Sequence, residues 1–347
     1  MHKRKLPIVA LILLLASALY VGYRYSTDFR PPSVKTQVEK TNEVLKHDRD
    51  VLKGAPAGEA EVYQALVRLG QMQEPLAQQE SIKRSTSPSA FVREGAANAL
   101  GNFGDEISLK TLKQLLADPE KAVRLQAIHG LGHRPGAGRE ELLRSAEKQN
   151  GLGAEEKVAI QVSLVESATN PQTRETALEQ LLKFSQADAS IAAPAALQVM
   201  SLAPQDERVL KMLRDLLKKD LDSVVSSTAI RHLSALRDPW MVENLGKWAT
   251  HSNAQLRMAA VQSVHIACPA ARWQILETAI TGERDRNILA EAINAPTYMP
   301  GKEAVTFLER MSHSDQLTKE ELVILTQKLV QLKASNQADP CLQPTAH

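Results

Sequence analysis

An aliphatic residue followed four positions later by a small residue recurs about every 32 residues along this chain. The clearest copies run from Val92 to Gly101 and from Val123 to Gly132, and both end in leucine-glycine. The residues that open the copies are Val62, Val92, Val123, Val158, Ile191, Val225, Leu256, Ile288 and Leu322. A motif that returns at this interval predicts a stack of similar units rather than one closed globule.

Each copy has the spacing of one helix face. Four positions past the opening residue, six copies carry alanine: Ala96, Ala127, Ala195, Ala229, Ala260 and Ala292. Eight positions past it, six copies are aliphatic: Leu100, Leu131, Val199, Leu233, Val264 and Val330. Because positions i, i+4 and i+8 share a helix face, the pattern predicts an apolar stripe whose small centre lets a neighbouring helix approach closely. Glu166 and Pro296 interrupt this stripe, so the register of the fourth and eighth copies is the weakest; Gly70 interrupts the first copy.

The segments between the copies contain residues that break helices: Pro88, Asp118-Pro119, Pro171, Pro204, Asp238-Pro239, Pro269 and Pro300. Proline fits the first turn of a helix or the residues just before it, so each unit is interpreted as two antiparallel helices joined by a short loop. Aromatic residues are only 4% of the chain, and no segment alternates for long among β-forming residues. The pattern therefore predicts an all-α solenoid of about eight or nine antiparallel helix pairs over residues 60–334.

The copies resemble the HEAT-repeat family, in particular the short bacterial repeats related to phycobilisome lyases. The resemblance depends on the run from Asp118 to Arg124 with Ala127 and Leu131-Gly132, and on a second set in the preceding copy, Val92-Arg93, Ala96 and Leu100-Gly101. Tetratricopeptide repeats have a similar period, but their tryptophan and tyrosine positions do not recur here. Membership of the HEAT family implies an α-solenoid that binds another protein, without implying which protein.

The first 25 residues are predicted to be a signal anchor or a signal peptide. Residues 2–5 are His-Lys-Arg-Lys, and residues 6–23 form an apolar run. This run is close to the lower limit of about 17 residues for a membrane-spanning helix. We prefer the anchor, a hydrophobic helix in a bacterial inner membrane with the repeat domain in the periplasm, because basic residues before a span stay in the cytoplasm. The alternative is cleavage near Ala18 and secretion.

Residues 26–59 are predicted to form a linker or stalk helix, since Val34, Val38, Leu45 and Leu52 have roughly helical spacing. A coiled-coil contact is the alternative to a solvated linker. The tail, residues 335–347, is predicted to be disordered.

Charge and cysteine content limit the partners of the chain. Its 42 lysines and arginines against 40 acidic residues give a net charge of +2, which is too balanced for a nucleic-acid-binding surface. The two cysteines, Cys268 and Cys341, could pair in an oxidising compartment. The preferred interpretation is that Cys268 is buried as a small apolar residue and Cys341 is free.

No catalytic or cofactor motif was found, so no enzymatic activity, cofactor or metal is predicted. The chain lacks a Gly-x-Ser-x-Gly elbow, a phosphate-binding glycine loop and a His-Glu-x-x-His motif. His129 and His133 have the spacing of a metal pair, but nearby glycine and proline residues place His133 at a helix end, which favours a surface role. No His-Glu dipeptide occurs, which excludes the iron hydroxylase of HEAT architecture. Export argues against the pigment-lyase activity.

Arginine follows the opening residue in three copies, at Arg93, Arg124 and Arg257. These residues could form an anion-binding row. The preferred interpretation is a structural ladder in which each arginine pairs with a nearby loop carboxylate, for example Arg124 with Asp118.

The candidate binding surface is the column six positions past the opening residue, on the second helix of each pair. Its members are Asn98, His129, Leu164, Leu197, Arg231, Gln262, Asn294 and Lys328. In a solenoid one helix row lines the concave surface, and this column mixes polar, basic and apolar residues as protein interfaces do. Asn98, His129, Arg231, Gln262, Asn294 and Lys328 are the proposed partner-binding residues. Trp240, Trp248 and Trp273 are expected to pack between repeats.

These features predict a non-catalytic scaffold that binds another protein on the outer side of the cytoplasmic membrane, to which residues 6–23 attach it. The alternatives are an accessory or lyase-type factor acting on a partner protein, and a structural protein of the cell envelope.

Overall fold

The computed structural model describes residues 34–342 except 134–135, 150, 188, 220–222, 316 and 336. The described residues form helices and no strands. The predicted hydrophobic helix, the membrane segment 6–23 and the cleavage site near Ala18 lie outside the described residues. Among the helices of the described part, none is both long and apolar enough to cross a bilayer.

The α-helices follow one another along the chain with short connections. The N-terminal ones are α2 (Val34–Leu52), α3 (Glu59–Gln71), α4 (Pro75–Arg84), α5 (Ala90–Leu100), α6 (Glu106–Leu115), α7 (Lys121–Gly132), α8 (Ala137–Glu147), α9 (Ala154–Ser167) and α10 (Pro171–Phe184). The C-terminal ones are α11 (Ala189–Leu202), α12 (Glu207–Lys219), α13 (Ser223–Ala235), α14 (Pro239–Ala249), α15 (Ala254–Ala267), α16 (Arg272–Gly282), α17 (Arg286–Asn294), α18 (Lys302–Met311) and α19 (Lys319–Lys333). Two 3₁₀ helices, η1 (Ala295–Tyr298) and η2 (Pro340–Leu342), complete the set.

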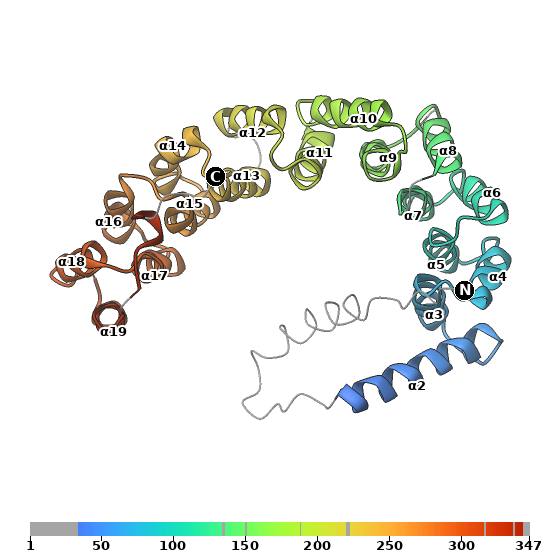
Figure 1. Cartoon of the computed structure of the whole chain (residues 1–347), viewed down its shortest axis with the longest axis horizontal. Coiled ribbons are helices and arrows are strands. Elements are labelled where there is room, and N and C mark those ends of the chain that lie inside the picture. Colours follow the sequence, from blue (N-terminus) through green and yellow to red (C-terminus); the bar gives the residue numbers. More distant parts are fainter. Residues whose placement is uncertain are drawn as a thin grey trace, which may run out of the picture.

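The helices form two rows along an open arc (Figure 1). Odd-numbered helices from α3 to α19 line the concave side, and even-numbered helices from α4 to α18 form the convex side. All nine opening residues of the sequence copies lie in odd-numbered helices. The predicted all-α solenoid is therefore confirmed: eight hairpins run from α4–α5 to α18–α19, and α2 with α3 adds a ninth pair at the N-terminal end.

Capping residues explain where many of the helices begin. At seven helix starts, the side chain of the N-cap residue accepts a hydrogen bond from a backbone N–H group of the first helical turn: Ser89, Asp105, Asn170, Asp238, Asn253, Asp285 and Thr318. Such caps satisfy N–H groups that have no partner within the helix. Proline occupies the first helical position of α4, α10 and α14. Several loops of the sequence pattern thus end in a residue suited to starting a helix.

Small residues let the concave row pack tightly. The six repeat alanines are fully buried. A Cβ added to Gly101 would lie 2.5 Å from the Cα of Gly130, and one added to Gly132 would lie 2.6 Å from the Oγ of Ser163. Side chains with a Cβ would force these helices apart. We attribute the curvature of the arc in part to these contacts, because they bring neighbouring odd-numbered helices close together.

The glycine contacts also correct the register of two copies. Gly70 contacts Ala99 in the same way as Gly101 contacts Gly130. Leu69-Gly70 is therefore the equivalent of Leu100-Gly101. The sequence pattern, which matched Gly70 to Leu100, places the first copy one residue too late. Ser163 contacts Gly132 in the same way as Gly130 contacts Gly101, so Ser163 is the equivalent of Gly130. The residue after it, Leu164, is therefore the equivalent of Leu131. The stripe interruption at Glu166 came from an alignment displaced by two residues.

The end of α2 belongs to the core rather than to a fully solvated linker. Val51 and Leu52 are buried together with Leu66 and Leu69 of α3. Asp48, also buried, accepts hydrogen bonds of 2.7 and 2.6 Å from the guanidinium of Arg68. The stalk helix therefore ends as the first packed helix of the solenoid.

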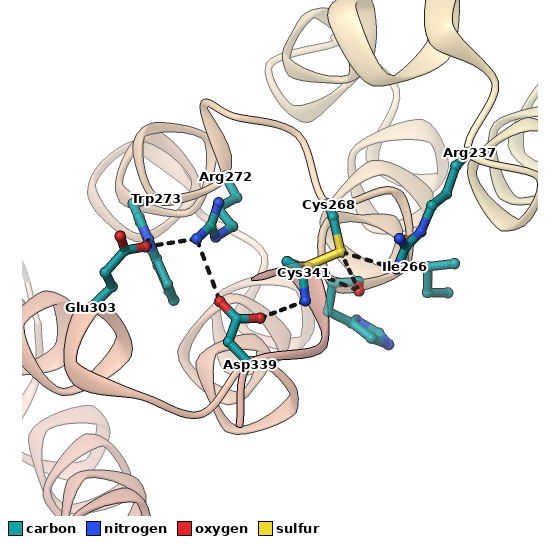
Figure 2. The surroundings of a disulfide bond; sticks show 9 residues. Arg237, Ile266, Cys268, Arg272, Trp273, Glu303, Asp339 and Cys341 are labelled. Carbon is teal, nitrogen blue, oxygen red and sulfur yellow. Dashed lines mark hydrogen bonds and ion pairs between the residues drawn. A yellow bond between two sulfur atoms is a disulfide. The ribbon is translucent and has the colours of Figure 1, made fainter. Parts of the chain in front are cut away.

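The preferred interpretation of the cysteines is wrong, because Cys268 and Cys341 form a disulfide. Their Cα atoms lie 5.3 Å apart although 73 residues separate them in the sequence. Residues 337–342 of the tail, expected to be disordered, return to the edge of the solenoid and contain η2 (Figure 2). Asp339 in this segment is buried and accepts a hydrogen bond from the backbone N–H of Cys341. The hairpins α16 to α19 lie within the loop that the disulfide closes.

Candidate partner-binding face

In three copies the arginine that follows the opening residue joins its own repeat to the next. The guanidinium of Arg93 donates two hydrogen bonds to the carboxylate of Asp118, at 2.7 and 2.8 Å. Its third nitrogen donates to the backbone carbonyls of Ser87 and Pro88, at the loop that precedes α5. A paired guanidinium and carboxylate with both groups largely buried is a strong, directional contact.

Arg124 and Arg257 repeat this geometry. Arg124 donates to the carbonyls of the residues six and five positions before it, and so does Arg257. Their carboxylate partners are Glu156 at 2.7 Å and Glu283 at 2.7 and 2.9 Å. The predicted ladder is confirmed. The example given for it was wrong, because Asp118 offers Arg124 its backbone carbonyl and gives its carboxylate to Arg93.

The pKa values of the acidic partners follow from these contacts. The hydrogen bonds from Arg93 hold the pKa of Asp118 below its ordinary 3.8, and those from Arg257 lower the pKa of Glu283. Burial alone would raise the pKa of Glu156, but hydrogen bonds from Arg124 and from the backbone of Gly153 lower it overall. All three carboxylates therefore stay ionised at neutral pH, so the arginines are neutralised within the protein and do not form an anion-binding row.

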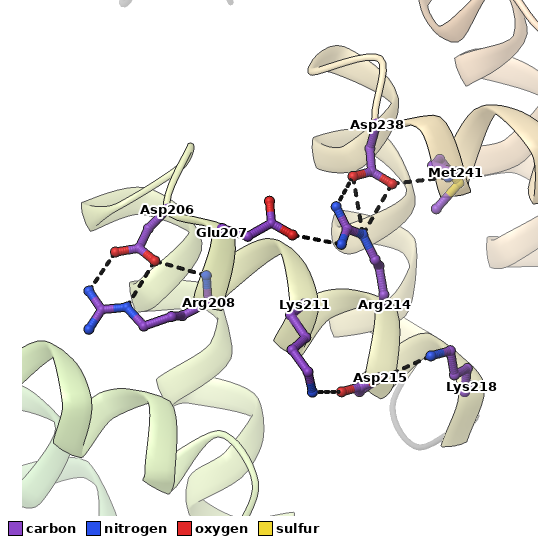
Figure 3. A network of polar contacts seen from close by, with 9 residues as sticks. All are labelled: Asp206, Glu207, Arg208, Lys211, Arg214, Asp215, Lys218, Asp238 and Met241. Carbon is purple, nitrogen blue, oxygen red and sulfur yellow. Dashed lines mark hydrogen bonds and ion pairs between the residues drawn. The ribbon is translucent and has the colours of Figure 1, made fainter.

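A convex helix carries a related pair (Figure 3). Arg214 of α12 donates to both carboxylate oxygens of Asp238, and Asp238 in turn accepts a 3.1 Å hydrogen bond from the backbone N–H of Met241. Asp238 thus caps α14 and ties it to the preceding convex helix. Asp118, which also precedes a proline, likewise binds an arginine and a backbone N–H group, but its arginine lies on the concave helix α5.

The predicted partner-binding column lies on the concave helices, away from this ladder. Asn98, Gln262, Asn294 and Lys328 are partly exposed, and His129 and Arg231 are exposed. Leu164 leaves the column, because the corrected register makes it a core residue that is only 3% exposed. Leu197 is partly buried.

The structure brings some members of the column together. The guanidinium of Arg231 on α13 donates a 3.2 Å hydrogen bond to the amide oxygen of Gln262 on α15. On α17, the amide of Asn294 donates to the hydroxyl of Tyr298 at 2.9 Å. These contacts orient polar side chains along three successive concave helices. Asn98 and His129 lie on α5 and α7, in the N-terminal half of the same surface.

Exposed apolar side chains on the concave helices were missed by the sequence analysis. Phe91 stacks on Tyr63 of α3 with ring centroids 4.6 Å apart, and yet it is 42% exposed. Val224 of α13 and Ile324 of α19 are also exposed, and so is Tyr298 of η1, which follows α17. Phe91 and Val224 each stand directly before an opening residue, so this position could have been recognised as a second surface column. Apolar groups beside amides and a cation are the mixture found in protein interfaces.

The tryptophans stabilise the convex row, as predicted. Trp248 is buried and its ring contacts that of Trp240 edge to face at 5.5 Å. Lys218 of α12 lies over the ring of Trp240, and Trp273 of α16 packs on Phe307 of α18. The contacts of Trp240 with α12 and of Trp273 with α18 join neighbouring convex helices, whereas the contact between Trp240 and Trp248 lies within α14.

The described residues contain no group of three or more histidine, cysteine, aspartate or glutamate side chains placed to hold a metal ion. His129 and His133 are both exposed near the end of α7.

Comparison with known families agrees with this architecture. A family model described as HEAT repeats matches residues 55–132 and 74–164. Residues 55–164 of this chain therefore belong to the HEAT-repeat family. Among curated proteins, no sequence matches it.

Solved structures resemble this chain at low sequence identity. The crystal structure of YibA from Escherichia coli has a TM-score of 0.51 and 14% identity, and covers 81% of this chain and 98% of that one. An engineered protein has a TM-score of 0.39 and 18% identity, over 90% of this chain and 97% of that one. Human deoxyhypusine hydroxylase, solved with glycerol, has a TM-score of 0.33 and 16% identity, over 76% and 98%. The likeness to YibA supports the fold alone.

Proposed function

We propose that this HEAT-repeat protein is a non-catalytic scaffold that holds a partner protein on its concave face. The observation that carries the proposal is a difference between two sets of side chains. Arg93, Arg124 and Arg257 are paired with carboxylates within the solenoid. The side chains of the column remain exposed or partly exposed at the surface: Asn98, His129, Arg231, Gln262, Asn294 and Lys328. Many moderate contacts along one rigid surface can together give high affinity.

We further propose that the repeats function on the outer side of a bacterial cytoplasmic membrane. The Cys268–Cys341 disulfide supports this location, since such bonds persist in oxidising compartments and are rare in the cytosol. The support is independent of residues 6–23, which we propose as the membrane attachment.

The test is capture of a partner from envelope extracts by tagged full-length chains. The double variant R231E/Q262R moves the positive charge from α13 to α15 and places a negative charge on α13. It keeps a polar pair between the two helices, so we expect the fold to be retained while the charge pattern of the concave surface changes. The matched control K113E/Q114R makes the same changes in charge on the convex helix α6, where both residues are exposed. We expect partner recovery to fall at least about tenfold for the concave variant, equivalent to about 1.4 kcal/mol, and to be unchanged for the control. Equal recovery with both variants would rule out the concave face as the binding surface.

A further inference from the structure

The disulfide at the edge of the solenoid lies in an asymmetric electrostatic environment. Arg237, in the loop between α13 and α14, donates from Nε to the carbonyl of Ile266 at 3.1 Å, which fixes its guanidinium. Its Nη2 lies 3.5 Å from the Sγ of Cys268 (Figure 2). A guanidinium beside a sulfur atom stabilises the thiolate form of that cysteine once the disulfide opens.

The other sulfur has an acidic neighbour. The carboxylate of Asp339 lies two residues before Cys341 and accepts a 2.8 Å hydrogen bond from its backbone N–H. Arg272 shares that carboxylate, at 3.4 Å, but also binds Glu303 at 2.7 Å. Negative charge near Cys341 disfavours a thiolate there, so the two cysteines differ in their ability to leave as thiolates.

We propose that Cys341 is a site of reversible modification by a low-molecular-weight thiol of the glutathione class. The thiolate of the small thiol attacks Sγ of Cys341 and forms a new S–S bond to it. The bond between Cys341 and Cys268 breaks, and its electron pair leaves with Cys268 as a thiolate beside Arg237. One thiolate is consumed and one is released, so no other oxidant, reductant or proton is required. Attack by the Cys268 thiolate on Cys341 reverses the reaction.

Modification of Cys341 rather than Cys268 has a structural consequence. Cys341 lies in the segment 337–342, which the disulfide holds against the loop after α15. After exchange, the ion pair between Arg272 and Asp339 still connects this segment to α16. The C-terminal hairpins therefore lose their covalent closure, while the solenoid core on which the concave face is built stays intact.

The first experiment maps the adduct. Oxidised full-length protein is mixed with reduced glutathione, quenched with acid at early times, alkylated with N-ethylmaleimide and analysed by peptide mass spectrometry. We expect glutathione on Cys341 and the maleimide on Cys268, in about tenfold excess over the opposite arrangement. Glutathione mainly on Cys268, an equal distribution, or a disulfide that glutathione does not open in the folded chain would each overturn the proposal.

The second experiment measures the rate of disulfide opening in variants of Arg237. R237Q should slow the reaction about threefold, because the leaving thiolate loses its cation. R237K keeps the charge and should restore most of the rate. The control R272Q loosens the tail through Asp339 without changing the groups beside Cys268, and should not slow the reaction. Circular dichroism verifies that each variant is folded. An unchanged rate in folded R237Q, or equal slowing in R237Q and R272Q, would contradict the assigned role of Arg237.

Discussion

The carboxylate of Asp118 binds the guanidinium of Arg93 through two hydrogen bonds and also accepts a 2.9 Å hydrogen bond from the backbone N–H of Glu120. One side chain thus joins α5 to the start of α7. The same kind of bond recurs at Arg124 and Arg257, so it links successive repeats at three places along the solenoid.

Replacement of Asp118 by asparagine should destabilise the solenoid in a pH-dependent way. D118N removes the charge that faces Arg93, and we expect a loss of about 1.5–3 kcal/mol in the free energy of unfolding at neutral pH. Denaturant titration of both proteins measures this loss.

The pH dependence has a definite sign. Because the pKa of Asp118 is lowered in the folded state, its contribution is complete above the ordinary value of 3.8 and is lost as the pH falls through the lower folded pKa. The difference between wild type and D118N should therefore shrink in acid. E141Q, at an exposed position of α8, is the control and should change stability little at any pH. A difference that grows on acidification would contradict the interpretation.

The contact between Gly101 and Gly130 should tolerate no side chain. In G101A the new methyl group would meet the backbone of α7, so we expect a loss of about 1–3 kcal/mol and a change in the separation of α5 and α7. G104A is the matched control, since no atom lies within 4 Å of a Cβ at that position. Thermal unfolding and small-angle X-ray scattering measure stability and curvature. Equal stability of the two variants would show that the helices adjust without cost.

Removal of the disulfide should weaken the C-terminal hairpins. For a closed loop of 73 residues, the chain-entropy model gives a contribution of about 4 kcal/mol. In C341S we expect faster amide hydrogen exchange in α16 to α19, with α3 to α9 unchanged. A reducing agent should produce the same pattern in the wild type and no further change in C341S. Uniform protection in all three samples would mean that the tail adds nothing to stability.

Removal of one complete repeat should leave a shorter solenoid. Deletion of residues 102–132 joins Gly101 to His133, so Gly101 takes the place of Gly132 against Ser163 and Arg93 takes the place of Arg124 against Glu156. Circular dichroism should show helical content per residue close to that of the wild type, and scattering should show a shorter maximum dimension. Deletion of residues 102–128 is the control, because it leaves an additional helical turn and shifts the register. If both deletions unfold equally, contacts between neighbouring repeats do not define the fold.

Much of the architecture could be predicted because its determinants repeat within short segments. Ala96 and Ala127 fix the small centre of the helix face, and Asp118-Pro119 and Asp238-Pro239 mark the loops that precede helices. The packing role of Trp273 also follows from its place in a convex helix. Such features depend on residues within one or two turns of each other, so the sequence displays them directly.

Other features depended on contacts between units. The register of the fourth copy became evident only when Ser163 was seen against Gly132, because Val162 and Leu164 are equally apolar in the sequence. Arg124 could pair with Asp118, which precedes it in the chain, or with an acidic residue that follows it. The position of the next concave helix, α9, places Glu156 beside Arg124, and this carboxylate accepts its hydrogen bond. The candidate site was predicted as a column, but the contact between Arg231 and Gln262 required the spacing of α13 and α15.

The sequence by itself determined that this chain forms helical hairpins, that they stack in order, and that one helix row has a small-residue stripe. These outcomes follow from helical periodicity and from the fit of each apolar face to the next unit. Only the tertiary structure decided that Cys268 meets Cys341 and that Arg237 lies beside one of the two sulfurs. The path of the chain around the arc sets which distant residues meet at its edge, and local spacing does not contain that information.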